Sequence, residues 1–302
     1  MDRIGGFLPG AIGVNTGLSR NKEKSQEIIK LYQEGYSSLK IAKIYDTTYD
    51  TIIRILDKNN IPRRSNKINS RQYNLNHNFF NNIDNEEKAY WLGFLYADGY
   101  LSFTLDDKRP RKIVGLSLGI KDINHLNKFN TCLESTYSIK IHTNTGFVKQ
   151  GYPATKYGRL CFTSDQLFDD LAKLGCIEHK TQTLKFPTEE QVPQYLLHHF
   201  LRGFMDGDGS IKITQPKDNK CIGFGLDFCG TTEMLDGIQK FFNTQLKLSK
   251  RHKNKTNNYS LSYGGNQSVY KKLLMLYKDA TIYLDRKYER FLQLQNYINS
   301  RA

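Results

Sequence analysis

The chain has 302 residues, of which 38% are hydrophobic and 12% aromatic, enough for cores in two or three compact units. Lys and Arg (44) outnumber Asp and Glu (30), giving a net charge of +14. This excess favours a polyanionic partner such as nucleic acid over a merely cationic soluble protein. No apolar run reaches the ~20 residues of a membrane span, and the five cysteines form no Cys-x-x-Cys pair. We therefore expect no membrane partner and a non-secreted protein, either cytoplasmic (bacterial or phage-encoded) or organellar.

The N-terminal part is predicted to be a loose arm (1–21) followed by a separate helical domain (22–66) and an Asn/Ser-rich linker (67–75). Apolar residues at helical spacing predict three helices in the domain, with Ser37 as the N-cap of the second. Helices joined by such short turns resemble the helix-turn-helix of resolvase-like DNA-binding domains. A small packing module without a DNA role is the alternative.

That resemblance makes the third helix, at about 48–58, the recognition helix, and two arginines follow it after Pro62. The residues expected to face DNA from this domain are Tyr49, Asp50, Ile53, Arg54, Arg63 and Arg64.

One stretch of the remaining chain occurs twice. Residues 90–101 read YWLGFLYADGYL and residues 200–211 read FLRGFMDGDGSI. Each copy is an apolar helical run with almost no polar face, so each helix is expected to be buried against the other. Gly93 and Gly203 occupy the same place in the two copies, where two backbones can approach closely.

Both copies end in Asp-Gly. Gly99 and Gly209 are expected to stop the helices in a left-handed conformation. Asp98 and Asp208 then lie at helix C-termini, where the helix dipole disfavours a carboxylate. A nearby divalent cation offsets both the dipole and the repulsion between two carboxylates. The pair therefore predicts a metal site.

Strands of period two follow each copy, and each half reads helix, two strands, helix, two strands, helix. We predict an α+β fold of two αββαββα repeats, 76–182 and 183–302, whose antiparallel sheets each have one buried and one polar face.

The two stretches resemble the paired signature of the LAGLIDADG homing endonucleases, in the two-repeat single-chain form. Trp91 to Gly99 and Leu201 to Gly209 fill the motif, which the first copy departs from with Tyr96 where the second has Asp206. The resemblance implies a monomeric nuclease whose sheets form a saddle on a long double-stranded DNA site. It also implies a staggered double-strand break that depends on Mg²⁺, or Mn²⁺, held by Asp98, Asp208 and the backbone carbonyls of Ala97 and Gly207.

Family members often place a basic or polar residue near the end of the second strand or near the fourth. Lys121 fits the first description, whereas in the second repeat ungapped strand register puts Cys229 there and a one-residue slip puts Gly230; Lys156 is another candidate. This asymmetry predicts two unequal active sites.

The saddle face is expected to contact DNA through polar and basic strand or turn residues. These are Ser102, Thr104, Lys112, Lys140, His142, Arg159, Lys212, Thr214, Lys247, Arg251 and Lys253. Two other functions stay open: a non-cleaving DNA-binding regulator on this fold, and an intron maturase that binds RNA. Both motif aspartates are intact, which favours the nuclease.

Overall fold

The computed structural model describes residues 21–34, 36–63, 73–106, 109–146, 151–177, 182–215, 221–251 and 257–301. The chain divides into two compact units, 1–72 and 73–302, and each is described by itself. None of the described helices combines the length and the apolar character that spanning a membrane requires.

The first unit is a bundle of three short helices, α1 (Lys22–Gln33), α2 (Ser38–Ile44) and α3 (Tyr49–Lys58). Each begins at a polar N-cap, and Ser37 is one of them, because its side chain accepts from the backbone N–H of Lys40 at 3.2 Å. The helices enclose a core that includes Ile28, Ile41 and Ile52, all fully buried.

The second unit contains both repeats of the predicted order. The first repeat is formed by α5 (Glu86–Asp98), β1 (Gly99–Asp106), β2 (Arg109–Gly119), α6 (Ile123–Cys132), β3 (Lys140–Asn144), β4 (Thr155–Thr163) and α7 (Asp165–Lys173). The second is formed by α8 (Leu197–Asp208), β5 (Ser210–Thr214), β6 (Gly223–Gly230), α9 (Thr232–Phe241), β7 (Ser249–Lys250), β8 (Tyr259–Tyr263) and α10 (Asn266–Tyr277), followed by α11 (Asp285–Asn299). The sheets are antiparallel, in strand order β1-β2-β4-β3 and β5-β6-β8-β7. The predicted α+β fold of two αββαββα repeats is confirmed.

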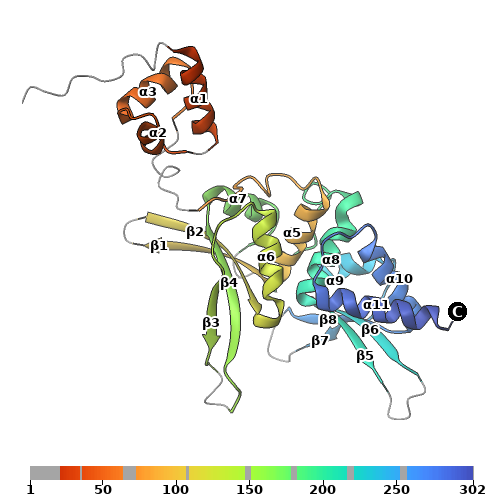
Figure 1. Cartoon of the computed structure of the whole chain (residues 1–302). Helices are drawn as coiled ribbons and strands as arrows, with labels where there is room; N and C mark the ends of the chain where they lie inside the picture. Colours follow the sequence, from red (N-terminus) through yellow and green to blue (C-terminus); the bar gives the residue numbers. More distant parts are fainter. Residues whose placement is uncertain are drawn as a thin grey trace, which may run out of the picture. The chain divides into compact units, whose positions relative to one another are not determined.

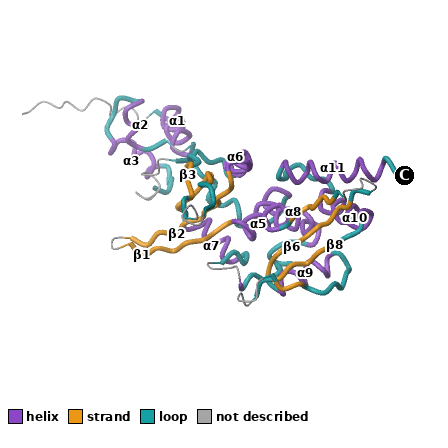
Figure 2. Tube along the Cα trace, turned by 90° about the horizontal axis from the view of Figure 1, so that it is seen from below, coloured by secondary structure: helices purple, strands orange, loops and turns teal. Residues whose placement is uncertain are grey.

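The paired helices α5 and α8 lie between the two sheets (Figures 1 and 2). Their backbones meet at glycines. A Cβ placed on Gly93 would lie 1.9 Å from the carbonyl oxygen of Phe200, and one on Gly203 would lie 1.9 Å from that of Tyr90. Only glycine permits such an approach. The sequence prediction of two buried helices in close contact is therefore confirmed.

A buried ionic network fastens the two repeats to each other and to the chain before α11. Arg202 of α8 is fully buried and donates to the backbone oxygens of Leu276 (2.8 Å) and Ile282 (3.0 Å). Its guanidinium also donates to Glu86 of α5 at 2.5 Å, and Glu86 accepts from the backbone N–H of Thr281 at 2.7 Å. The buried charge is paired, as burial requires.

The predicted left-handed helix stops are wrong. Gly99 and Gly209 have φ values of −72° and −92°, because the chain passes directly from each helix into the extended backbone of a strand. Glycine is needed there for space instead. A Cβ on Gly99 would lie 2.6 Å from the side chain of Leu95, and one on Gly209 would lie 2.6 Å from the carbonyl oxygen of Met205.

Helix α9 ends at Phe241, because Asn243 takes a positive φ of 50° and the backbone N–H of Thr244 donates to the carbonyl oxygen of Gln239 at 2.9 Å. Strand β7 is confined to two residues.

Candidate metal and nucleic-acid site

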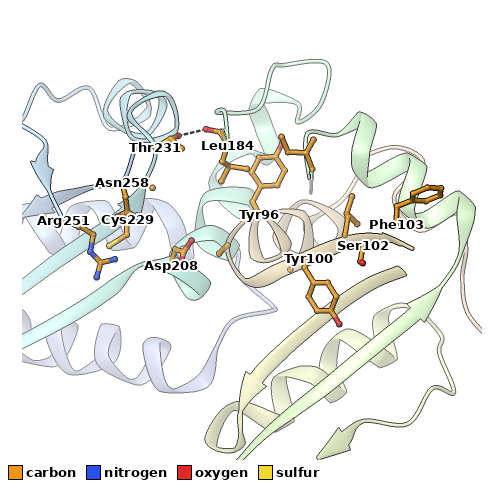
Figure 3. A pocket seen from close by; sticks show the side chains of 15 residues that line it. Tyr96, Tyr100, Ser102, Phe103, Leu184, Asp208, Cys229, Thr231, Arg251 and Asn258 are labelled. Atoms are coloured by element: carbon orange, nitrogen blue, oxygen red, sulfur yellow. Dashed lines mark hydrogen bonds between the residues drawn. The ribbon is translucent and has the colours of Figure 1, made fainter. Parts of the chain in front are cut away.

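The two motif aspartates lie at the exposed ends of the paired helices. Asp98 is the last residue of α5 and Asp208 the last of α8. The helices are still in contact there, because a Cβ on Gly207 would lie 2.2 Å from that of Ala97 and 3.4 Å from Oδ2 of Asp98. One carboxylate is thus held beside the backbone that precedes the other. Figure 3 shows Asp208 at the edge of the neighbouring cleft.

A buried lysine caps the end of α8. Lys287 of α11 donates to the carbonyl oxygens of Met205 (2.6 Å), Asp206 (2.6 Å), Gly207 (3.4 Å) and Gly209 (2.7 Å). Carbonyl groups at a helix C-terminus have no partner within the helix and carry a partial negative charge. The ammonium group therefore satisfies this end and offsets its charge.

The electrostatic field at this lysine links it to both aspartates. Burial lowers the pKa of Lys287 to about 8, Asp206, Asp98 and Asp208 oppose that shift, and Arg286 adds to it. Both motif carboxylates therefore act on one cation at the end of α8.

The contact between helices α5 and α8 is called the seam below. The donor groups at its exposed end fit a hard divalent cation. Two carboxylates and the neighbouring backbone carbonyls of Ala97 and Gly207 are oxygen ligands, which Mg²⁺ prefers. In the part of the chain that the structure describes, no group of three or more His, Cys, Asp or Glu side chains is positioned to hold a metal.

The end of α5 is built differently. The carbonyl oxygen of Leu95, the counterpart of Met205, accepts from the thiol of Cys176 at 3.7 Å. The hydroxyl of Tyr96, the counterpart of Asp206, donates to the carbonyl oxygen of Leu174. Beside this end lies a cleft of about 700 Å³ that Tyr96 and Ala97 line together with Asp208 (Figure 3).

The far wall of the same cleft comes from the second sheet. Cys229, at the end of β6, and Arg251, just after β7, line it. Burial raises the pKa of the Cys229 thiol, Arg251 acts against that shift, and Asp208 adds to it. A guanidinium and a motif carboxylate are therefore neighbours of one thiol, an arrangement able to hold a phosphate beside the carboxylate.

The open face of the first sheet carries most of the residues predicted to face DNA there. Strand pairing places Ser102 opposite Ile113, Thr104 opposite Arg111, and Arg159 opposite Lys140. His142 stacks on Tyr157 with ring centroids 5.3 Å apart, and Arg159 donates to Ser117 at 3.3 Å. Basic and aromatic groups thus share one polar face.

Lys112 does not lie on that face. It follows the parity of the buried Val114 and Leu116, and its ammonium group pairs with Asp169 and lies 5.4 Å from the ring centroid of Phe168, both on α7. Because side chains alternate along a strand, its assignment to the open face is corrected.

The second sheet brings Lys212 and Thr214 to its open face, both exposed, and Lys247 and Arg251 are exposed on either side of β7. Lys253 lies outside the described residues.

In the first unit, Tyr49, Asp50 and Arg54 of α3 are exposed, as predicted for a recognition helix. Ile53 is not, with only 8% of its surface exposed, because it completes the apolar stripe packed against the other helices.

Arg63 is exposed but bound to Asp57, donating to its Oδ1 at 2.9 Å. Asp57 therefore takes N–H donors of the guanidinium that a DNA phosphate would otherwise accept from. Arg64 lies outside the described residues.

Lys121 lies in a 3₁₀ turn (Ile120–Asp122) after β2 and is exposed. The strand registers change its counterpart in the second repeat. Tyr100 and Ser210 occupy the same place after the two motif helices, and they pair with Gly115 and Asp227, so β2 and β6 are offset by two residues from the ungapped alignment of those helices. Lys121 then corresponds to Glu233, not to Cys229 or Gly230.

Sequence reasoning missed two groups. Lys287 lies on the buried face of α11 with Phe291 and Leu294, and a charged residue in such a stripe was the available signal. Asp227 is 8% exposed and sits on the open face of the second sheet, where the alternation of β6 put a polar residue. Its ion pair with Lys212 joins two strands, and the sequence of neither strand alone indicates it.

Comparisons with known proteins agree with this architecture. Residues 201–298 match the family model described as LAGLIDADG endonuclease. Residues 18–59 match that of the helix-turn-helix domain of resolvase. The resemblance drawn from the two motif copies and the N-terminal helices is therefore confirmed. No curated protein matches the chain.

Similar solved structures include the LAGLIDADG homing endonuclease I-GzeII in complex with a DNA target, at 13% identity, covering 72% of this chain and 91% of that chain, with a TM-score of 0.48. The LAGLIDADG meganuclease I-AabMI bound to uncleaved DNA is 13% identical over 72% of this chain and 92% of that chain, with a TM-score of 0.46.

Proposed function

We propose that this protein is a site-specific homing DNA endonuclease that makes a staggered double-strand break by metal-dependent phosphodiester hydrolysis. The observation that carries the proposal is the pair of exposed carboxylates, Asp98 and Asp208, at the ends of two helices in backbone contact. A structural role gives no reason to bring two carboxylates to two negative helix ends. The match of residues 201–298 to an endonuclease family supports the same function.

The two sheets would bind DNA through their open faces. An antiparallel β-ribbon fits the major groove, and its side chains contact base edges while basic residues hold phosphates. Arg111, Lys140 and Arg159 on the first sheet and Lys212 on the second supply cations, in keeping with the net charge of +14. One chain carries both sheets, so we propose that it acts as a monomer on a long double-stranded site, with the N-terminal helices adding contacts.

Mg²⁺, or Mn²⁺, would be held by Asp98 and Asp208 with help from the backbone carbonyls of Ala97 and Gly207. When bound, the ion supplies an activated water and neutralises charge on the departing oxygen. The protein's own part is to fix the two carboxylates at the crossing of the helices. One aspartate per strand of the duplex would give two cuts.

Cations near the aspartates complete the proposed site. Lys287 neutralises the carbonyl end of α8 and thereby lets Asp208 approach a phosphate with less surplus negative charge. Arg251 lines the same cleft as Asp208 and would hold that phosphate. Lys121 remains a candidate for the first repeat, since it is exposed after β2.

The test is to incubate the protein and Mg²⁺ with plasmids that carry the uninterrupted insertion site of its own gene. The proposal predicts linear product with a staggered end, and no product when the metal is chelated. Tight DNA binding without cutting under all divalent metals would instead establish the non-cleaving regulator, to which the N-terminal helix-turn-helix is also suited. Binding to intron RNA without binding to DNA would establish the maturase.

A further inference from the structure

An ion pair lies on the open face of the second sheet. Lys212 of β5 pairs with Asp227 of β6. The carboxylate side chain is 12% exposed and the lysine side chain is 61% exposed. The acid therefore lies low on the sheet and the cation extends outward from it.

The fold itself does not require this pair. By strand register, Asp227 lies opposite Ser210 just as Gly115 lies opposite Tyr100 in the first repeat, and Lys212 corresponds to Ser102. Gly115 is covered by the ring of Tyr100, which a Cβ would meet at 2.2 Å. One sheet is thus closed by an aromatic ring where the other holds a carboxylate.

A carboxylate on this face needs a reason, because it repels the phosphates that the surrounding cations attract. The groups around it are small. Ser210 and Ser262 lie directly opposite Asp227 on the neighbouring strands, and Gly223 and Gly225 share its face of β6. These neighbours leave the pair accessible to a duplex and provide no bulky side chain to keep bases away.

We propose that Lys212 and Asp227 form a preset pair that reads one G·C base pair in the major groove, an inference that rests on the proposed function. Guanine presents two acceptors there, N7 and O6, and the paired cytosine presents the N4 amino donor. The ammonium group donates to the guanine, and the carboxylate accepts from the cytosine or holds the ammonium in place for the guanine. An A·T pair also presents an acceptor and a donor, but only guanine offers two adjacent acceptors to the ammonium group.

The carboxylate also sets what the lysine does. A lone lysine on a flexible stem binds whichever phosphate is near and carries no sequence information. Bound to Asp227, the Lys212 ammonium is directed toward the floor of the groove and away from the phosphate backbone. The substitution Asp227→Asn therefore frees the lysine, converting a base contact into a phosphate contact.

The experiment uses the full-length protein and a library of randomised duplex DNA. Bound sequences are selected without divalent metal, sequenced, and compared for the wild type, Asp227→Asn, Lys212→Met and the double variant. In the wild type, one G·C pair should be preferred by roughly 5- to 100-fold. Asp227→Asn should lose that preference at this one position, while total affinity rises and the salt dependence steepens by about one phosphate contact.

Two further variants make the test specific. Lys212→Met keeps the stem, removes the cation and should lose the preference at the same position, and the double variant should do no worse than the more affected single one. Lys140→Met, an exposed lysine on the first sheet, should weaken binding to all sequences alike. Unchanged base preferences in both Asp227→Asn and Lys212→Met, with the wild type selecting a site, would overturn the pair. A wild type that selects no DNA sequence would overturn the proposed function instead.

Discussion

The two repeats share their element order and their glycine-lined seam, yet they close their motif helices with different chemistry. At the end of α8, the ammonium group of Lys287 is bonded to four carbonyl oxygens. At the end of α5, the carbonyl oxygen of Leu95 accepts from the thiol of Cys176. The contact between α5 and α8 therefore fixes where the two aspartates lie, whereas the charge around each aspartate is set by the segment that follows its own repeat.

The residue two positions before each aspartate shows the same dependence. Tyr96 is satisfied by a carbonyl oxygen of the segment after α7. Asp206 is buried and accepts from the backbone N–H of Leu284, after α10, and from the hydroxyl of Tyr90, both at 2.8 Å. Burial raises the pKa of Asp206, with Lys287 acting against that shift. A neutral phenol in one repeat and a carboxyl group in the other therefore occupy equivalent positions and give the two helix ends different electrostatic surroundings.

The strongest test of the comparison removes each aspartate in turn. Asp98→Asn and Asp208→Asn should each reduce double-strand cutting by about 1,000-fold or more, because an amide is a poor metal ligand and one ligand per strand is lost. Cutting of supercoiled plasmid, followed as nicked and linear products, measures this. DNA affinity measured by fluorescence anisotropy should stay within about threefold, since both side chains lie at helix ends and not on the sheets.

Unequal sites should also show in the single variants. If Lys287 makes the α8 end the better one, Asp98→Asn should leave more nicked circle than Asp208→Asn does. Unchanged linear product from either variant would contradict the assignment of that aspartate.

A second test concerns what the repeats share. Gly93→Ala and Gly203→Ala should each destabilise the protein by about 3 kcal/mol or more, because the new methyl group would meet a backbone carbonyl that cannot move aside. Urea unfolding monitored by circular dichroism measures the change. Gly119→Ala is the matched control, since nothing lies within 4 Å of its Cβ position, and it should change stability by less than about 0.5 kcal/mol. A large difference between the two seam variants would show that the helices do not pack symmetrically.

The third test addresses the helix ends directly. Lys287→Met keeps the volume but leaves several buried carbonyls without a donor, which should cost about 2 kcal/mol of unfolding free energy. Cys176→Ala removes only a weak thiol donor and should cost less, about 1 kcal/mol. In the cutting assay, Lys287→Met should raise the nicked fraction and Cys176→Ala should not. Equal effects of the two variants in both assays would mean that the ends are equivalent.

How far the sequence could be interpreted follows from the same contrast. The apolar motif helices and the alternating residues from Ile222 to Phe228 were predictable, because the spacing of apolar residues along a single helix or strand is visible in the sequence. The two aspartates were predictable because they are repeated. Three features were not predictable: the face of the sheet on which Lys112 lies, the counterpart of Lys121 in the second repeat, and the Lys212–Asp227 ion pair. Strand register and contacts between distant segments determine all three.

The smallest expected effect comes from His125 of α6, which is buried. The Tyr90 hydroxyl donates a hydrogen bond to Asp206, so His125 Nε2 donates to the Tyr90 oxygen, 2.9 Å away. Burial, followed by the charges of Lys128, Arg286 and Lys287, lowers the pKa of His125 to about 3. The unfolded chain binds a proton with a pKa of about 6.5 that the folded protein refuses, so stability falls as the pH drops from about 6.5 toward 3. Between about pH 7 and about pH 5.5 this group alone should remove about 1 kcal/mol of unfolding free energy.

The variant His125→Phe, which suits a site lined by the rings of Trp91 and Phe94, should show a correspondingly flatter decline of the unfolding free energy, measured by urea unfolding over that pH range. His199, whose pKa burial lowers to about 4, keeps a slope in both proteins, so equal slopes would mean that His125 does not stay neutral in the fold.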